Sequence, residues 1–247
     1  MGFLTLYKRD MMNIITNPPL VLTNTIFPLL FIVILGYLSS DIYGEATITS
    51  YDYYGITILI YSVLNVSMTA SNSFMESSLK SSNLRVMYSP IRTSYVYITK
   101  VLATFTFTSI CLLFVMLVTH IWLKVSFGGR YAIYVVIIAL LFNMFSSVVG
   151  ILCCCILKSE EVTNAILTII NNIFAILGGI FFSLDGYGDM IRVVSYISPV
   201  KWVVECMMKI VYDHDLSLFG VTGSIFIVLS SLGLFFCSVF FKEEDYV

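Results

Sequence analysis

Residues Tyr131–Leu157 read YAIYVVIIALLFNMFSSVVGILCCCIL and contain no Asp, Glu, Lys or Arg. A helix rises about 1.5 Å per residue, so about 20 apolar residues cross the roughly 30 Å of bilayer hydrocarbon. This stretch exceeds that requirement. It therefore predicts a helix that crosses a membrane.

The bulk composition points the same way. Of 247 residues, 59% are apolar and 11% are charged, and the mean hydropathy is +0.95. Soluble domains average about 45–50% apolar and about 25% charged residues, so lipid must solvate much of this surface. Together with five further apolar blocks, the stretch places six spans near Leu20–Leu38, Gly55–Phe74, Val96–Trp122, Tyr131–Leu157, Val162–Ser183 and Gly220–Phe241. We predict an all-α membrane protein in which residues 1–247 form a single transmembrane domain.

The first block follows Lys8 and Arg9, a pattern shared with cleaved signal peptides. A signal's apolar region is only about 7–15 residues long, whereas this block is longer and lacks an A-x-A cleavage site. We therefore expect a retained span.

Residue types that often carry chemistry lack the spacing that such chemistry requires. The run Cys153-Cys154-Cys155 has no zinc-like spacing, so we interpret it as packing rather than as a metal site. His120 and His214 are far apart and belong to no catalytic motif. A G-x-x-x-x-G-K-[ST] phosphate loop is absent, and no basic tract indicates nucleic acid. We expect no enzyme activity from this chain alone, and no cofactor or metal on it.

Lysine and arginine in short loops set the orientation of membrane helices. With the N-terminus inside, the inner segments hold Lys8, Arg9, Lys80, Arg85, Arg92, Lys100, Lys158 and Lys242. The two short outer loops hold only Lys124 and Arg130, and acidic residues balance the basic ones in the longer outer segment. We expect a multi-pass protein of the cell membrane with both termini cytoplasmic.

Two segments have helical patterns but do not qualify as spans. Residues 1–19 carry apolar side chains at helical spacing and end at Pro18-Pro19, which predicts an interfacial helix rather than a frayed lead-in. Ser198 and Pro199 open a second segment that runs to about Tyr212. Charges recur in it at i, i+4 positions, which predicts a short surface helix at the outer interface. These charges are Lys201, Glu205, Lys209 and Asp213, and Trp202 is the expected anchor.

The largest cytoplasmic connection, Glu76–Pro90, is polar and basic. Leu84 and Met87 lie three residues apart, on one face of a short helix, so they can fill a partner's groove while Arg85 meets an acidic or lipid surface. A solvated loop without a partner has the same composition. Both interpretations stay open.

Polar side chains form a stripe on each of two spans. Tyr61, Asn65, Thr69 and Asn72 lie about one helical turn apart in the second span, and Asn164, Thr168, Asn171 and Asn172 lie similarly in the fifth. An unpartnered amide costs roughly 2–7 kcal/mol in apolar surroundings, so each stripe should face the other or a water-filled path. The stripes can therefore line a substrate path or join helices to each other.

Most spans lack Asp, Glu, Lys and Arg. Ion-coupled carriers usually need such groups inside the membrane, so we expect the energy to come from outside the bilayer. The same scarcity of charge indicates an apolar or amphipathic cargo.

These features resemble the permease subunit of type-2 ABC exporters, a family of drug, lipid and polysaccharide exporters, over essentially the whole chain. In that family the first cytoplasmic loop has an acidic residue, then Gly-Thr-Leu-Arg-x-Leu, then Ser/Thr-Pro, with a basic residue opening the next span. The matching residues here are Glu76, Ser82-Asn83-Leu84-Arg85-Val86-Met87, Ser89-Pro90 and Lys100. Ser82 and Asn83 depart from the usual Gly-Thr, and Ser77 stands where an arginine often follows the acid.

The resemblance implies a coupling helix within about Glu76–Ser89 that docks on a separate cytoplasmic ABC ATPase subunit, which holds the ATP and Mg. It assigns coupling to Glu76, Leu84, Arg85, Met87, Ser89 and Pro90. It also implies a second permease copy, identical or paralogous, and a central path lined by the second and fifth spans. The expected path residues are Tyr61, Asn65, Thr69, Asn72, Asn164, Thr168 and Asn171.

Two functions of other classes stay open beside an exporter subunit. One is a membrane interaction or assembly protein without transport activity, which would need no polar stripes. The other is a self-sufficient channel or carrier. Co-purification with an ATPase separates the exporter subunit from both.

Overall fold

The structure, a computed structural model, describes residues 2–40, 49–75, 93–182 and 188–241. No strand occurs among these residues. Six helical stretches in the described part of the chain are long and apolar enough to cross a membrane. They are Pro18–Leu38, Ser50–Met75, Ser94–Trp122, Gly129–Leu157, Glu160–Leu177 and Phe219–Phe240. The prediction of an all-α membrane protein with six spans is confirmed.

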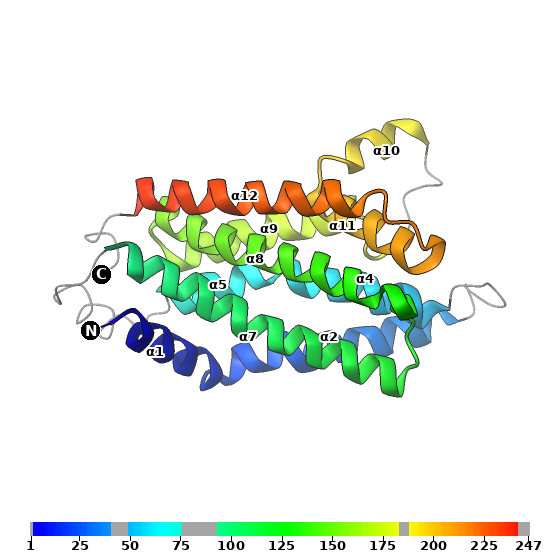
Figure 1. The fold of residues 1–247 in the computed structure, drawn as a ribbon, viewed down its shortest axis with the longest axis horizontal. Helices are drawn as coiled ribbons and strands as arrows, with labels where there is room; N and C mark the ends of the chain where they lie inside the picture. The colour runs from blue at the N-terminus through cyan, green and yellow to red at the C-terminus, as the bar shows by residue number, and fades with distance from the viewer. Residues whose placement is uncertain (1, 41–48, 76–92, 183–187, 242–247) are drawn as a thin grey trace.

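The spans run side by side along the long axis of the molecule (Figure 1). They are formed by α2 (Pro18–Leu38), α4 with α5 (Ser50–Leu64 and Val66–Met75), α7 (Thr93–Trp122), α8 (Ala132–Leu157), α9 (Glu160–Leu177) and α12 (Phe219–Phe240). The start of α1 (Phe3–Ile15) and the end of α12 lie at the same end of the bundle. The span made by α4 and α5 is the most enclosed of the six. In an apolar stretch of 18 residues, 78% of its residues are buried, against 22% in the corresponding stretch of α9.

The second span differs from its predicted range of 55–74. Helix α4 begins at Ser50, because the Thr49 side chain accepts a hydrogen bond from the Asp52 backbone N–H while the Asp52 carboxylate accepts from Thr49. This reciprocal cap satisfies donors that a helix start otherwise leaves open. The span is then interrupted at Asn65, where α4 ends and α5 begins one residue later.

The fifth span is shorter than its predicted range of 162–183. Helix α9 ends at Leu177, and the chain turns at Gly178 and Gly179, where Gly179 has a φ of +74°. That backbone conformation suits glycine because other residues have a Cβ that clashes. Two tyrosines of α4 hold the turn: the hydroxyl of Tyr53 donates to the Gly179 carbonyl at 2.6 Å, and that of Tyr54 donates to the Phe181 carbonyl at 3.2 Å.

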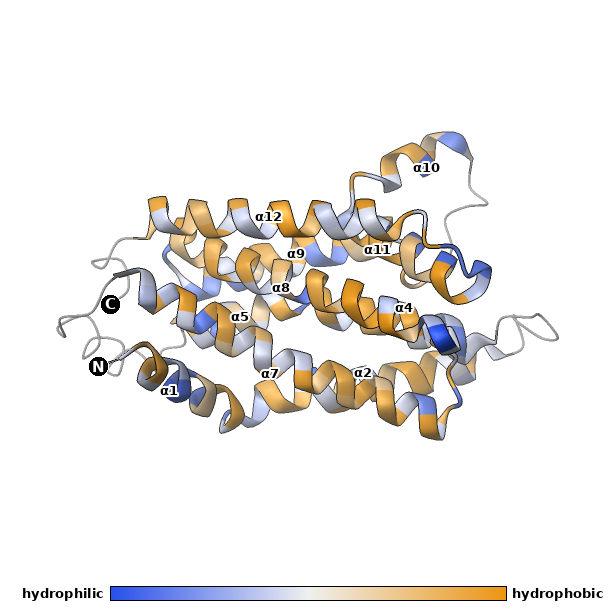
Figure 2. Ribbon diagram, viewed as in Figure 1, coloured by the Kyte–Doolittle hydropathy of each residue, from blue (hydrophilic) through white to orange (hydrophobic). Residues whose placement is uncertain are grey.

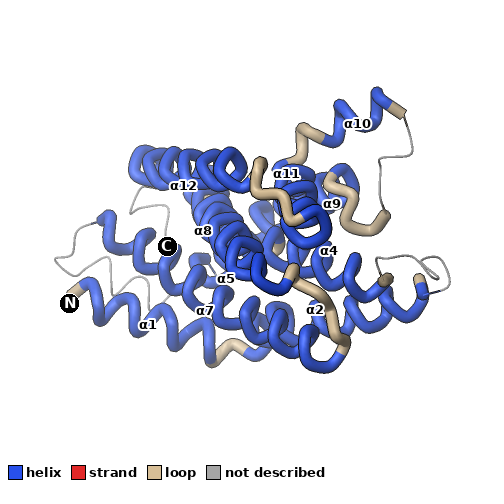
Figure 3. The backbone as a smooth tube through the Cα atoms, turned by 45° about the vertical axis from the view of Figure 1, so that its right-hand side comes forward, coloured by secondary structure: helices blue, strands red, loops and turns tan. Residues whose placement is uncertain are grey.

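The segment from Ser198 to about Tyr212 is helical as predicted, but it is largely buried and does not form the predicted surface helix. Helix α11 (Pro199–Met208) begins at the expected Ser198 cap and continues as the π-helix η3 (Lys209–Asp213). Its apolar side chains are buried beside α4 and α9, next to which α11 lies in Figure 3. The charges at i, i+4 cover one narrow stripe, on which Lys209 meets Glu205 at 4.0 Å. Apolar residues fill the other faces, so hydrophobic burial determines where the helix packs.

Helix α1 is amphipathic as predicted, yet its buried face includes a charge. Leu6, Asp10 and Ile14 recur at i, i+4 spacing and are buried, and α1 packs along α7. The Phe3 ring packs edge-on against the Tyr95 ring of α7, with 5.4 Å between ring centres. The apolar residues Leu4 and Ile15 are exposed, which suits a helix at a membrane surface.

Apolar residues cover most of the span surfaces, as the orange colouring in Figure 2 shows. Helices α2, α9 and α12 each expose several large apolar side chains. Since the chain crosses the bilayer, these faces are suited to lipid or to another membrane subunit. Short helix α10 (Asp189–Ser195) stands away from the bundle at the end where α12 begins (Figure 1).

Small residues allow α8 to cross α5 at close range. A Cβ added at Gly150 of α8 would overlap the Ser67 carbonyl oxygen of α5 and approach Ala70 Cβ to 2.8 Å. Close approach through small residues is a common way to pack helices in membranes. Gly150 thus sets the distance between α8 and the enclosed α5.

We expect Gly150→Val to destabilise the fold by about 1–3 kcal/mol, because the added side chain must push two buried helices apart. Thermal unfolding of the detergent-solubilised protein measures this loss. The matched control is Gly220→Val at the start of α12, where an added Cβ meets nothing within 4 Å. Equal unfolding temperatures for the two variants would contradict the tight crossing.

Candidate functional site

The two polar stripes predicted from the sequence face each other across α5 and α9. Asn164 donates to the Asn72 side-chain oxygen at 2.6 Å. Asn171 donates to the Ser67 hydroxyl at 3.0 Å and to the Asn65 side-chain oxygen at 3.3 Å. These contacts define a polar seam between the second and fifth spans.

The seam continues toward the turn that follows α9. The Tyr61 hydroxyl donates to the Asn172 side-chain oxygen at 3.1 Å, and the Tyr61 ring meets Phe181 edge-on at 5.6 Å. The Thr168 hydroxyl donates to the Asn164 carbonyl of its own helix at 2.7 Å and lies 3.7 Å from the Met68 sulfur of α5. Six of the seven expected path residues lie on α4, α5 or α9, and Asn65 lies between α4 and α5. All of them except Thr69 take part in the seam.

The break at Asn65 lies in the seam. The Asn65 amide donates to the Tyr61 carbonyl at 2.9 Å, and the Ser67 hydroxyl donates to the Leu64 carbonyl at 2.9 Å. The Leu64 carbonyl at the interruption thus accepts from the side chains of Ser67 and Asn171, whereas the Tyr61 carbonyl also accepts from the Asn65 backbone N–H. A broken membrane helix is tolerated where protein or a water-filled cavity surrounds the break.

Thr69, the remaining expected path residue, points toward α2. Its hydroxyl accepts a hydrogen bond from the Asn24 amide at 3.0 Å, and Asn24 also donates to the Leu20 carbonyl at 2.8 Å. Both Thr69 and Asn24 are buried. This contact links the first span to the second at the level of the seam.

A groove of about 290 Å³ lies between α2 and the α4–α5 span. Four of its lining residues are the stripe of the second span: Tyr61, Asn65, Thr69 and Asn72. The α2 wall contributes apolar and aromatic side chains. The other lining residues are Pro19, Leu20, Thr23, Asn24, Phe27, Pro28, Phe31, Ile58, Ser62 and Met68.

The groove lining contains amides, hydroxyls and aromatic rings and no ionisable carboxylate, amine or imidazole. Amide groups can both donate and accept hydrogen bonds, so they suit uncharged polar groups. Phe27 and Phe31, each about half exposed, offer apolar surface opposite these amides. The arrangement can bind a neutral molecule that has both polar and apolar parts.

The α2 wall is the part of the groove that the sequence interpretation missed. Thr23-Asn24-Thr25 is a single polar run inside an apolar span, too short to form a stripe. Its position in an otherwise apolar helix was the available signal, because a lone buried amide needs a partner.

Metal binding and histidine-based catalysis have little support in the described ranges. Among those residues, no group of three or more His, Cys, Asp and Glu side chains could hold a metal ion. His120 contacts the Val125 carbonyl through Nδ1 at 2.9 Å, and His214 stacks on Tyr131 at 5.0 Å between ring centres. The residues expected to couple to an ATPase lie outside the part of the chain that the structure describes: Glu76, Leu84, Arg85, Met87, Ser89 and Pro90.

Comparison with known protein families identifies the family to which this chain belongs. The family model described as ABC-2 type transporter matches residues 1–212, which include α1 to α11 and both walls of the groove. The chain belongs to the ABC-2 type transporter family. No curated protein matches it.

Membership of the ABC-2 family makes the chain a membrane component of an ABC transporter, a multi-pass protein whose family associates with ABC ATPases. Such membrane components are generally not catalytic themselves. The recognition of a type-2 ABC permease from the sequence is confirmed.

The Asn72–Asn164 contact gives a direct test of the polar seam. We expect a double-mutant cycle with Asn72→Ala and Asn164→Ala to yield a coupling energy of about 0.6–1.7 kcal/mol, the range for hydrogen bonds between membrane helices. Unfolding in mixed micelles with increasing denaturing detergent measures the four free energies.

The control cycle combines Thr106→Ala and Ser231→Ala, whose hydroxyls bond to carbonyls of their own helices. Additive losses are expected there. Additivity at Asn72 and Asn164 as well would mean that the two amides do not hold α5 and α9 together.

Proposed function

We propose that the chain is the membrane-spanning subunit of an ATP-driven exporter of an apolar or uncharged amphipathic molecule, such as a drug, an antimicrobial peptide or a lipid-like compound. The groove between α2 and the α4–α5 span carries this proposal. Its amides can bind the polar part of a cargo, while Phe27 and Phe31 contact the apolar part. A strongly charged solute finds no counter-charge among the groove's lining residues.

A second permease copy, identical or paralogous, completes the path. Thr168 and Asn172 of α9 are exposed beside the apolar Ile169 and Ile173. Polar side chains directed at lipid are costly, so a second subunit or a water-filled path should cover this face. The groove of about 290 Å³ is also at the lower end of the roughly 300–1,000 Å³ of small-molecule sites, and a facing copy would enlarge it.

Energy enters through residues 76–90. Leu84, Arg85, Met87 and Pro90, with Glu76 and Ser89, dock on a cytoplasmic ABC ATPase subunit that binds ATP and Mg, whereas this chain carries no cofactor. Closure of two ATPases pushes the docked segments and shifts the spans between inward-facing and outward-facing states. ATP binding can do so only by stabilising one state more than the other.

The orientation proposed is that of a cell-membrane protein with both termini cytoplasmic. Lys8, Arg9, Lys100 and Lys158 then lie on the inner side, in agreement with the excess of basic residues in cytoplasmic segments. An even number of spans brings the start of α1 and the end of α12 to one side, and they do lie at one end of the bundle (Figure 1).

The groove is tested in the complex with its ATPase by measuring ATP hydrolysis in the presence of a panel of neutral and charged amphiphiles. We expect neutral amphiphiles to stimulate hydrolysis and Asn65→Leu to change which of them do so, because this substitution removes an amide from the lining. Unchanged selectivity would contradict the role of the groove. The matched control, Ser231→Leu on the exposed face of α12, should keep the parent's selectivity.

The same assay separates coupling from cargo binding. The double variant Leu84→Asp with Arg85→Glu should keep basal hydrolysis by the ATPase and lose stimulation by every amphiphile, because the docking surface is altered and the groove is intact. Full stimulation in this variant would assign coupling to other residues.

A further inference from the structure

Two opposite charges are buried at the end of the bundle where α1 begins. Asp10 of α1 is 3% exposed and Lys100 of α7 is 1% exposed, and their Oδ1 and Nζ atoms lie 3.7 Å apart. Taking two charges out of water is costly, and their attraction offsets this cost only when further hydrogen bonds satisfy both groups. The surroundings of the pair supply those bonds.

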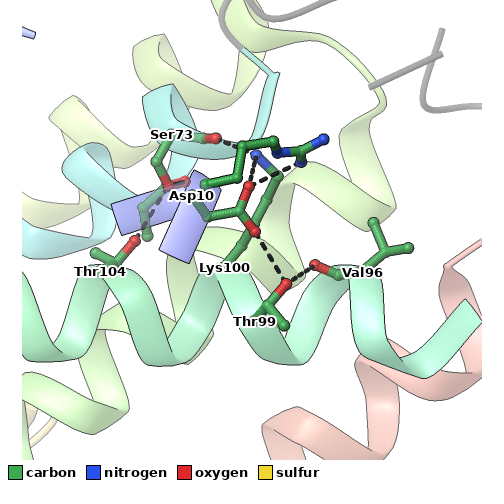
Figure 4. A network of polar contacts seen from close by, with 8 residues as sticks. Asp10, Ser73, Val96, Thr99, Lys100 and Thr104 are labelled. Atoms are coloured by element: carbon green, nitrogen blue, oxygen red, sulfur yellow. Dashed lines mark hydrogen bonds and ion pairs between the residues drawn. The ribbon is translucent and has the colours of Figure 1, made fainter. Parts of the chain in front are cut away.

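Figure 4 shows the network around the two side chains. Asp10 Oδ2 accepts a hydrogen bond from the Thr99 hydroxyl at 2.9 Å, and Oδ1 accepts from the Arg9 guanidinium at 2.8 Å. Lys100 Nζ donates to the Ser73 carbonyl at 2.6 Å. That carbonyl belongs to the last turn of α5, where the helix dipole favours a cation.

The network joins three helices at one point. Asp10 lies on α1, Lys100 and Thr99 lie on α7, and Ser73 lies on α5. Helices α5 and α7 are the two that flank residues 76–92 in the chain. Any displacement of the ends of α5 and α7 therefore acts on α1 through Asp10.

Helix α1 leads directly to the groove. It ends at Ile15, and α2 begins at Pro18, so only two residues separate them. Pro18 and Pro19 restrict the backbone at this junction. A shift of α1 is thus passed to α2, whose Asn24, Phe27 and Phe31 line the groove.

Stability alone is a weak reason for a buried ion pair, because well-packed apolar residues of similar volume often replace one without loss. We propose that Asp10 and Lys100 are positioning residues of the transport cycle, which transmit movement at the inner ends of α5 and α7 through α1 to the α2 wall of the groove. This inference rests on the proposed function, since the movement originates in the ATPase.

The test measures whether α2 moves when nucleotide binds. Nitroxide labels at Tyr37→Cys and Trp122→Cys report the distance between the ends of α2 and α7, since both positions are at least 71% exposed. Double electron–electron resonance is recorded on the reconstituted complex with its ATPase, with and without a non-hydrolysable ATP analogue. Of the native cysteines, only Cys153 is partly exposed, and the unsubstituted chain gives its background labelling.

The parent complex should change this distance when nucleotide binds. In the double variant Asp10→Leu with Lys100→Met, which replaces both charges by apolar groups, we expect assembly and ATP hydrolysis to persist and the distance change to be lost. The charge-swapped variant Asp10→Lys with Lys100→Asp should restore part of it. The control Glu205→Gln with Lys209→Met removes an ion pair of α11 and η3 and should behave as the parent does.

A full distance change in the apolar double variant would overturn the proposal. Failure of both the apolar and the swapped variants to assemble would also overturn it, because the pair would then serve folding alone. A parent complex that hydrolyses ATP without any change in distance would contradict the proposed function itself. This outcome is distinguishable because it is seen in the parent complex, before any variant is made.

Discussion

The hydrocarbon core of a bilayer cannot donate or accept hydrogen bonds, and this constraint shapes the interior of the bundle. An amide or hydroxyl in a span is costly unless it bonds to another protein group or faces water. The stripes of the second and fifth spans bond to each other, in contacts such as Asn72–Asn164 and Asn171–Ser67, although Asn164 Oδ1 accepts no hydrogen bond from the described residues. Helix α5 is enclosed and has polar contacts with several neighbours, among them α9 across the seam, α2 through Asn24 and α7 through Lys100.

The geometry is compatible with both interpretations of the stripes, substrate lining and helix joining. Asn171 is buried and its amide is directed to α5, as expected for a group that joins helices. Asn65 takes part in the same contact and also lines the groove. One face of the stripe can therefore hold the bundle together while another remains available to a cargo.

The polar groups at the two levels of the bundle differ in kind. The groove in the membrane has neutral amides and aromatic rings, which suit a cargo that must enter and leave. The end of the bundle where α1 begins has the Asp10–Lys100 ion pair, whose contacts join α1, α5 and α7. Neutral groups bind weakly enough to release a ligand, whereas buried charges resist separation because each would be left without a partner.

The sequence predicted the spans and the stripes because both depend on local periodicity. It did not predict the buried α11, because the charge spacing of Lys201, Glu205 and Lys209 indicated a surface and the apolar faces beside it were given less weight. It also missed the meeting of Asp10 and Lys100, since the contact joins residues far apart in the chain. The early end of α9 depends on Gly178 and Gly179 and on tyrosines of another helix. Contacts between helices cannot be predicted from the length of an apolar stretch.

The central claim is that the groove beside α2 and α5 opens to water during an ATP-driven cycle. Its most direct test is the rate at which a membrane-impermeant thiol reagent modifies Ser62→Cys, a groove position, in the complex with and without trapped nucleotide. The account predicts that this rate changes with nucleotide, while Ser231→Cys on the lipid-facing surface of α12 stays unreactive in both states. A cysteine at position 62 that is unreactive throughout would contradict it.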